Sequence, residues 1–318
     1  MIIKKAETAV LTCITVLVFM AISSTACPAA EASSEARGNL LFNSGWSYIA
    51  HPANQPNELP GEGWSTVELP HTWNATDPVD TVPGYRRGVG WYRKTVSFDS
   101  TRENVRRLLR FEAANMKATV FVNGRHAGGH VGGYLGFTVE IGPWLEDGIE
   151  NEILVRVDNG VDRNLIPSQK SDFVLYGGIT RDVYLQSRPE TFISRIRIDT
   201  PSVSAGSATA VVAANIDGTA ADARVRFRLI APGGEVLATT EPIEVSGETA
   251  TLELPPVMQP RLWAPDDPAL YRVVAELIDT SGQALHSLED EFGFRWFEFD
   301  ENGAFVLNGE RLLLRGTH

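Results

Sequence analysis

The stretch that most constrains the fold lies at residues 111–159. Residues 119–122 form a β-branched and aromatic run that is followed at once by Asn123-Gly124. An Asn-Gly pair accepts the positive φ angles that a two-residue hairpin turn demands. Residues 137–141 and 153–157 then alternate apolar and polar side chains, as half-buried strands do. The stretch therefore predicts the centre of an antiparallel β domain.

Glycines mark the middle of this stretch. Gly128, Gly129 and the pair Gly132-Gly133 predict a loop and argue against a helix. His126 and His130 lie in the same predicted loop, with the i, i+4 spacing of a metal-binding pair on a helix. Because no helix is predicted and no third ligand is near in sequence, we expect no metal site.

The same alternation of short strands and turns continues along the chain and predicts an all-β fold. The strand-like runs before residue 189, at this spacing, are typical of a jelly roll or sandwich. A second set, with a turn at Pro232-Gly233-Gly234, fits an immunoglobulin-like sandwich without a disulfide. The predicted strands are 40–42, 46–49, 67–70, 89–98, 108–113 and 181–186, then 194–199, 209–215, 223–230, 249–254 and 271–278, with a hairpin at 305–314.

Charge and composition narrow the classes of partner. The 28 glycines and 18 prolines of the 318 residues favour β structure rich in turns. The formal net charge of −12 argues against nucleic-acid or anionic-membrane partners, because both require clustered Lys and Arg.

The N-terminus has the pattern of a secretory signal. Lys4 and Lys5 precede a short apolar core at residues 10–22, which is too short for a comfortable membrane span. Cys13 and Cys27 are the two cysteines of the chain, so no disulfide framework is expected in the folded part. We expect a secreted or periplasmic protein.

An alternative for the N-terminus is lipidation. Ser24-Thr25-Ala26-Cys27 is similar to a bacterial lipobox, which would make an outer-membrane lipoprotein anchored through Cys27. Because the usual aliphatic first residue is missing, we rank this anchor below simple cleavage. The small and polar residues 28–37 predict a disordered tether.

Eight motifs occur in a fixed order along the chain. The motifs are Phe42-Asn43-Ser44-Gly45-Trp46, Leu69-Pro70-His71-Thr72-Trp73-Asn74, Gly90-Trp91-Tyr92-Arg93-Lys94, Phe121-Val122-Asn123-Gly124, Tyr176-Gly177-Gly178-Ile179-Thr180-Arg181-Asp182-Val183, Leu262-Trp263-Ala264-Pro265, Phe292-Gly293-Phe294-Arg295 and Leu307-Asn308-Gly309 through Leu314-Arg315-Gly316. Their order resembles that of glycoside hydrolase family 2, which contains β-galactosidases, β-glucuronidases and β-mannosidases. The Arg86-Arg87-Gly88 approach to Trp91 is most similar to the β-galactosidase branch.

The resemblance implies a jelly-roll sugar-binding domain, an immunoglobulin-like domain and a TIM barrel that carries the catalytic glutamates. We therefore expect a signal peptide and tether at 1–36, the jelly roll at 37–188, the second sandwich at 189–296 and the start of a truncated barrel at 297–318. Retaining glycosidases use two carboxyl groups about 5 Å apart, and no acidic pair here falls in a catalytic motif. The chain is expected to be an inactive N-terminal part whose partner is its own barrel.

The resemblance also implies where substrate binds. Asp172 matches by spacing the aspartate that holds sugar hydroxyls in β-galactosidases of the family, and the alternative is a loop aspartate or a partner of Arg181. Arg86 and Arg87 are further substrate-binding candidates, against the reading of a solvated surface pair. No cofactor is identifiable in this chain, although the family's barrels use Mg or Na. The sequence leaves a homo-oligomer open.

Two further alternatives remain from the residues alone. Trp46, Trp73 and Trp91 suit sugar stacking, but their strand pattern favours a buried core. The rival to the enzyme hypothesis is a non-catalytic carbohydrate-binding protein of two β domains. Asn74-Ala75-Thr76 is a glycosylation sequon, to which the bacterial-type leader gives little weight.

Overall fold

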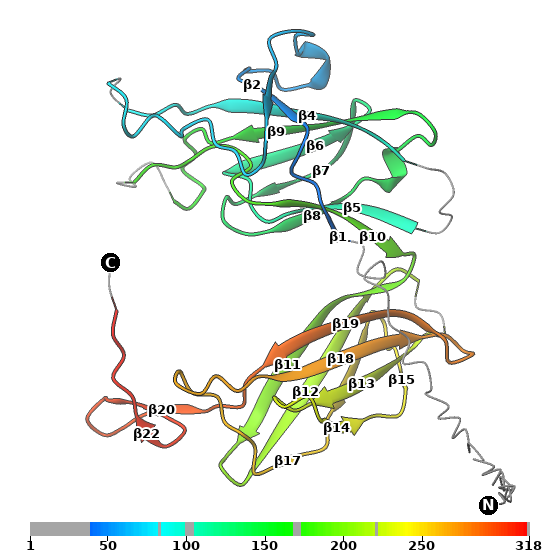
Figure 1. Ribbon diagram of the computed structural model, residues 1–318, viewed down its shortest axis with the longest axis vertical. Coiled ribbons are helices and arrows are strands. Elements are labelled where there is room, and N and C mark those ends of the chain that lie inside the picture. Colours follow the sequence, from blue (N-terminus) through cyan, green and yellow to red (C-terminus); the bar gives the residue numbers. More distant parts are fainter. Residues whose placement is uncertain (1–38, 82–83, 99–104, 168–172, 220–221, 317–318) are drawn as a thin grey trace, which may run out of the picture. The chain divides into compact units, whose positions relative to one another are not determined.

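The computed structural model describes residues 39–81, 84–98, 105–167, 173–219 and 222–316 (Figure 1). Apart from two short 3-10 turns at Pro56–Glu58 and Gly142–Trp144, every regular element in these ranges is a β-strand, so the predicted all-β class is confirmed. No helix in the described residues is long and apolar enough to cross a membrane. The predicted signal segment, Cys13, Cys27, the tether up to residue 38 and Asp172 lie outside the described residues.

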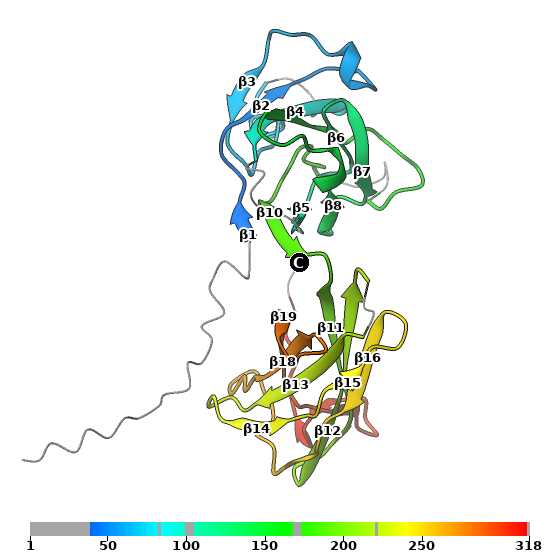
Figure 2. The same ribbon diagram turned by 90° about the vertical axis from the view of Figure 1, so that its right-hand side faces the viewer.

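The first sandwich consists of a six-stranded and a four-stranded antiparallel sheet that face each other (Figures 1 and 2). The larger sheet has the order β3-β2-β4-β9-β6-β7 and the smaller one β1-β10-β5-β8. The strands are β1 Asn39–Leu41, β2 Trp46–Ile49, β3 Ser65–Val67, β4 Val89–Ser97, β5 Val105–Phe111, β6 Lys117–Val122, β7 Arg125–Val131, β8 Phe137–Glu140, β9 Glu150–Asp158 and β10 Val183–Pro189.

Alternation within β6 separates two apolar clusters. Val120 and Val122 are fully buried between the sheets, whereas Phe121 points to the opposite face and packs on Trp91 with ring centroids 5.7 Å apart. The turn after β6 is the predicted one, because Asn123 and Gly124 have φ angles of 49° and 75°. The stretch 111–159 thus supplies four paired strands of the sandwich.

The predicted glycine loop is wrong for Gly128 and Gly129, which lie inside strand β7, whereas Gly132 and Gly133 do lie in the loop between β7 and β8. A Cβ atom on Gly129 would lie 2.5 Å from the carbonyl oxygen of Ala118 on the neighbouring strand. The glycine therefore permits a close approach of two backbones, a role that glycine has in strands as well as in loops.

A β-bulge in β7 also determines on which face of the sheet each of the two histidines lies. His126 pairs with Phe121 on the outer face, but Gly128 pairs with Val120 on the core face. His130 therefore lies on the core face, where its ring stacks on Phe137 at 4.8 Å. The two imidazoles point to opposite sides of the sheet, and the described residues contain no group of three or more metal-binding side chains.

The second sandwich has two antiparallel sheets around a core that includes Phe227, Val273, Leu277 and Phe294. One sheet joins β11, β12, β16 and β17, and the other joins β14, β13, β18, β19 and β15. The strands are β11 Phe192–Val203, β12 Ser207–Asp217, β13 Arg224–Ile230, β14 Val236–Thr239, β15 Ile243–Glu244, β16 Thr249–Glu253, β17 Val257–Met258, β18 Tyr271–Ile278 and β19 Ala284–Phe292.

A third small sheet consists of β20 Phe297–Phe299, β21 Phe305–Leu307 and β22 Glu310–Arg311. The predicted turn is confirmed, because Asn308 and Gly309 have φ angles of 54° and 84°. Phe297 and Phe299 lie on one face with Phe305, and Glu298 lies on the other. Phe297 and Phe299 are 63% and 64% exposed, so the aromatic face of this sheet is open. No closed barrel is formed by the described strands.

The open aromatic face predicts self-association. Phe297→Glu combined with Phe299→Glu should keep the chain monomeric at concentrations where the parent associates, because exposed apolar sheet surface promotes contact between copies. Sedimentation velocity over a concentration series measures this. Glu298→Gln, on the opposite face of the same strand, should associate like the parent. Equal association of the parent and the double variant would contradict the prediction.

Candidate functional site

Two loops of the first sandwich meet along their backbones. The segment 69–74 follows β3, and the segment 173–180 precedes β10. The His71 amide donates to the Ile179 carbonyl at 2.8 Å, and the Trp73 amide donates to the Gly177 carbonyl at 3.3 Å. The Thr72 hydroxyl adds a bond to the same Gly177 carbonyl at 2.9 Å. Two motifs that are a hundred residues apart in sequence therefore form one unit.

The glycines of the second motif are required by this contact. A Cβ atom on Gly177 would lie 2.1 Å from Cζ2 of Trp73. Gly178 has φ +131°, and a Cβ there would lie 2.4 Å from the His71 carbonyl oxygen. Only glycine fits either position without a shift of the neighbours. The Tyr176-Gly177-Gly178 motif thus fixes Tyr176 beside His71.

Two fully buried asparagines join the loops from inside. Asn74 accepts from the Gly177 amide at 2.7 Å and donates to Asp77 at 2.7 Å and to the Arg86 carbonyl at 2.8 Å. Asn159 accepts from the Gly88 amide at 2.9 Å and donates to the Leu175 carbonyl at 2.9 Å. Buried amides with partners at both ends favour one loop arrangement. They also leave the sequon at Asn74 without an accessible acceptor amide, since this side chain is 0% exposed.

Arg86 is engaged within the domain. Its guanidinium donates to the Tyr48 hydroxyl at 2.7 Å and to the Val89 carbonyl at 2.6 Å, and it lies 4.8 Å from the ring centroid of Trp73. Its backbone amide donates to Asp77 at 2.6 Å, and this bond is the main reason why the pKa of the Asp77 carboxyl is lowered. Arg86 therefore links the loop to strands β2 and β4.

The other two predicted site residues are Arg87 and Asp172. The Arg87 guanidinium lies 4.8 Å from the ring centroid of Tyr85 and donates to its hydroxyl. Asp172 lies outside the described residues, so its distance to either arginine is not defined. Substrate contact by these three residues stays a prediction.

An aromatic cluster supports the loop contact. The ring of Tyr48 lies 4.9 Å from His71, 5.2 Å from Tyr92 and 5.9 Å from Trp73 between centroids. His71 Nδ1 shares a hydrogen bond of 2.8 Å with the buried Tyr92 hydroxyl. Burial lowers the pKa of His71 and raises that of Tyr92, so both groups are neutral at pH 7.

A shallow hollow of about 290 Å³ opens where these loops reach the surface. Tyr176 in its wall is 42% exposed. Sequence reasoning missed this hollow, although a tyrosine before a paired glycine was a usable signal. The lining residues are Pro70, His71, Thr72, Tyr176 and Thr180.

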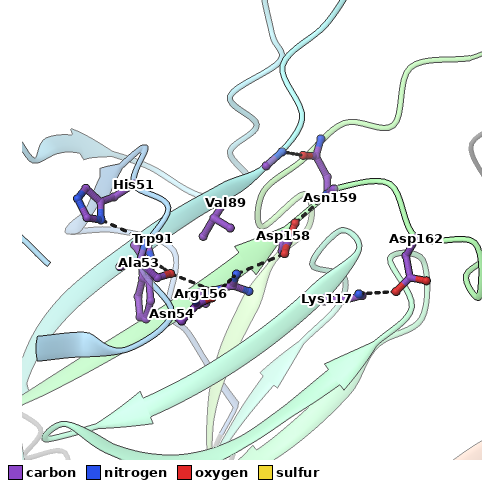
Figure 3. Close-up of polar contacts among 12 residues, drawn as sticks. His51, Ala53, Asn54, Val89, Trp91, Lys117, Arg156, Asp158, Asn159 and Asp162 are labelled. Carbon is purple, nitrogen blue, oxygen red and sulfur yellow. Dashed lines mark hydrogen bonds and ion pairs between the residues drawn. The ribbon is translucent and has the colours of Figure 1, made fainter. Parts of the chain in front are cut away.

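Trp46 and Trp91 are 0% exposed and belong to the core, as their strand pattern predicts. Trp91 belongs to the apolar cluster on the outer face of the large sheet. Figure 3 shows it beside Ala53, to whose carbonyl the Trp91 Nε1 donates at 3.3 Å. Arg156 donates to the same carbonyl at 3.2 Å and pairs with Asp158 at 3.4 Å. These polar groups bind one another and the segment that covers the sheet, and Trp91 is not open for stacking on a sugar.

Comparison with known families matches both sandwiches. The profile described as the sugar binding domain of glycosyl hydrolases family 2 covers residues 49–189. The profile described as glycosyl hydrolases family 2 covers residues 191–295.

Individual relatives are named as β-glucuronidases and β-galactosidases. A protein of Formosa agariphila, provisionally named a β-glucuronidase, is 40% identical over 279 residues, which is 87% of this chain and 34% of the relative. A β-glucuronidase of Bacteroides fragilis is 33% identical over 88% of this chain and 41% of its own length. A β-galactosidase of Thermoanaerobacter pseudethanolicus is 29% identical over 89% and 38%. The chain thus spans between a third and about two fifths of these relatives.

Solved structures agree. A β-glucuronidase 2 of Bacteroides uniformis, covalently bound to cyclophellitol-6-carboxylate aziridine, superimposes with a TM-score of 0.80 at 32% identity, over 88% of this chain and 35% of that one. With two profiles of one family matched in succession over most of its length, the chain belongs to glycosyl hydrolase family 2.

Proposed function

We propose that the protein to which this chain belongs hydrolyses terminal β-glycosidic bonds, with β-glucuronides as the preferred class. The observation that carries the proposal is the identity of 40% and 33% to proteins named as β-glucuronidases, against 29% to one named as a β-galactosidase. A β-galactoside, the substrate expected from the Arg86-Arg87-Gly88 motif, is the second candidate.

The proposed mechanism is a retaining one. Such enzymes form and then hydrolyse a covalent glycosyl intermediate with two carboxyl groups about 5 Å apart. We assign both groups to the polypeptide that the relatives have beyond their match to this chain. The present chain would supply a wall of the substrate site.

The loop after Asp172 supports that role for the first sandwich. The Tyr176 carbonyl accepts from Nδ2 of the buried Asn115 at 2.7 Å, and the Leu175 carbonyl accepts from Asn159 at 2.9 Å. The segment directly behind Asp172 is therefore anchored on two sides. An anchored loop can present a carboxylate to two adjacent sugar hydroxyls, which form charge-assisted hydrogen bonds.

A non-catalytic carbohydrate-binding protein is the alternative from a different class. The match to a profile described as a sugar binding domain favours it, because binding alone requires no catalytic pair. The two proposals differ in whether the longer protein turns over substrate.

The chain of 318 residues should be catalytically silent on its own. No acidic pair in it matches a catalytic motif, so aryl β-glucuronide, β-galactoside and β-mannoside should all remain intact in a chromogenic assay. The longer protein, assayed beside it, should cleave the β-glucuronide fastest. Turnover by the purified chain that survives further purification would contradict the assignment of the catalytic groups.

Asp172→Asn in the longer protein should lower kcat/KM by roughly ten- to a hundredfold. Loss of a charge-assisted hydrogen bond to substrate costs about 1.5–3 kcal/mol. Steady-state kinetics measure the loss, and the melting temperature should stay within about 1–2 °C of the parent, because the proposed role of Asp172 is to bind substrate and not to stabilise the fold.

Asp182→Asn is the matched control. Asp182 accepts from Asn43 at 2.8 Å and from the Tyr184 hydroxyl at 3.3 Å, so its loss should cost about 1–2 kcal/mol of stability with little effect on kcat/KM. Normal kinetics for Asp172→Asn together with a lowered melting temperature would make Asp172 a structural residue.

A further inference from the structure

We infer that the hollow between Tyr176 and His71 binds one neutral pyranose ring. It is a site of the first sandwich itself, and the described residues that line it do not include Arg86 or Arg87. The inference takes its ligand class, carbohydrate, from the proposed function.

The lining has the chemistry of a sugar site. Tyr176 offers an exposed aromatic surface, and Pro70 adds an apolar ring. Thr180 and His71 supply polar atoms beside them. Sugar rings have apolar C–H faces and equatorial hydroxyls, so a flat aromatic wall with a few fixed polar groups matches both of their surfaces.

His71 is fixed for this task. Its backbone amide is bonded to Ile179 at 2.8 Å, and its Nδ1 is bonded to the Tyr92 hydroxyl at 2.8 Å. Within the described part of the chain Nε2 has no protein partner, so it is the ring atom left to serve a ligand. A side chain whose orientation is already set loses little entropy when a ligand binds.

The backbone around Tyr176 is also fixed by hydrogen bonds. Asn115 binds its carbonyl, and Asn74 binds the amide of the next residue, Gly177. Gly178 forms a bridge back to Asn115. The exposed ring therefore projects from a loop whose backbone is hydrogen-bonded on both sides, which is the arrangement that a binding platform requires.

Size and charge select the ligand. A hollow of about 290 Å³ is at the low end of ligand pockets, which span about 300–1,000 Å³, and suits one ring. The five described residues that line it include no Asp, Glu, Lys or Arg, and burial keeps His71 neutral by lowering its pKa. With no positive charge among these described residues to bind a carboxylate, the hollow should prefer a neutral glycoside to a uronic acid.

The test is a saturation-transfer NMR titration of the 318-residue chain with methyl β-glucopyranoside and methyl β-glucuronide. The neutral glycoside should bind more tightly than the glucuronide. Tyr176→Ala should lower the affinity for the neutral glycoside by about tenfold, because an aromatic contact of this kind contributes about 1.4 kcal/mol or less to binding. His71→Phe, which keeps an aromatic ring but removes both Nε2 and the Nδ1 bond to Tyr92, should weaken the binding of the neutral glycoside as well.

Tyr134→Ala is the matched control. Tyr134 is 48% exposed in the same sandwich and does not line the hollow, so its loss should leave binding unchanged. Circular dichroism melts establish that each variant is folded. The inference would be overturned if Tyr176→Ala bound the neutral glycoside as tightly as the parent does. It would also be overturned if Tyr134→Ala lost as much affinity as Tyr176→Ala, or if the parent bound the glucuronide more tightly than the neutral glycoside.

The outcome is separable from that of the proposed function. Binding at the hollow is measured on this chain, whereas hydrolysis is measured on the longer protein, so the two readouts are independent. A longer protein that cleaves no glycoside would refute the proposed hydrolase while binding of the neutral ring to this chain persists. Binding that is absent in this chain, with hydrolysis intact in the longer protein, would refute the hollow alone.

Discussion

The contact between Gly177-Gly178 and the His71–Trp73 backbone is the constraint on which the surface of the first sandwich depends. Each Cβ that is absent there would lie within 2.4 Å of a heavy atom of the opposite loop. Because the loops approach so closely, their amides and carbonyls bond directly to each other, and the neighbouring side chains have little freedom. Tyr176 and His71 are placed by backbone contacts, which changes at the surface do not easily disturb.

Buried asparagines add hydrogen bonds to the close loop contact that the glycines permit. Asn74, Asn115 and Asn159 are at most 2% exposed and bind loop backbone at Gly177, Tyr176 and Leu175. A buried amide that loses its partners is costly, so each one specifies a loop position as well as contributing to stability. Three of the five buried polar side chains in the described residues therefore bind the loop that carries Tyr176, while the core cluster between the sheets is apolar.

Local sequence signals predicted much of the fold, and long-range register decided the remainder. Asn123-Gly124 and Asn308-Gly309 were predictable because their positive φ angles depend on two residues alone. The strand β7 was not, since Gly129 is set by the Ala118 carbonyl on another strand. The separation of His126 from His130 depends on a bulge that no spacing in the sequence reveals. The hollow likewise joins segments a hundred residues apart.

Two surfaces are left open in the described chain, and their shapes favour different occupants. The face that bears Phe297 and Phe299 is a sheet surface without polar atoms among its aromatic side chains, so it suits another polypeptide that excludes water over an area. The hollow at Tyr176 is small and concave and mixes one aromatic ring with hydroxyl and imidazole groups. A protein surface gains little from so small a concavity, whereas one sugar ring uses both its apolar wall and its polar atoms. The distinction between a docking face and a ligand site therefore follows from curvature and from the spacing of polar atoms.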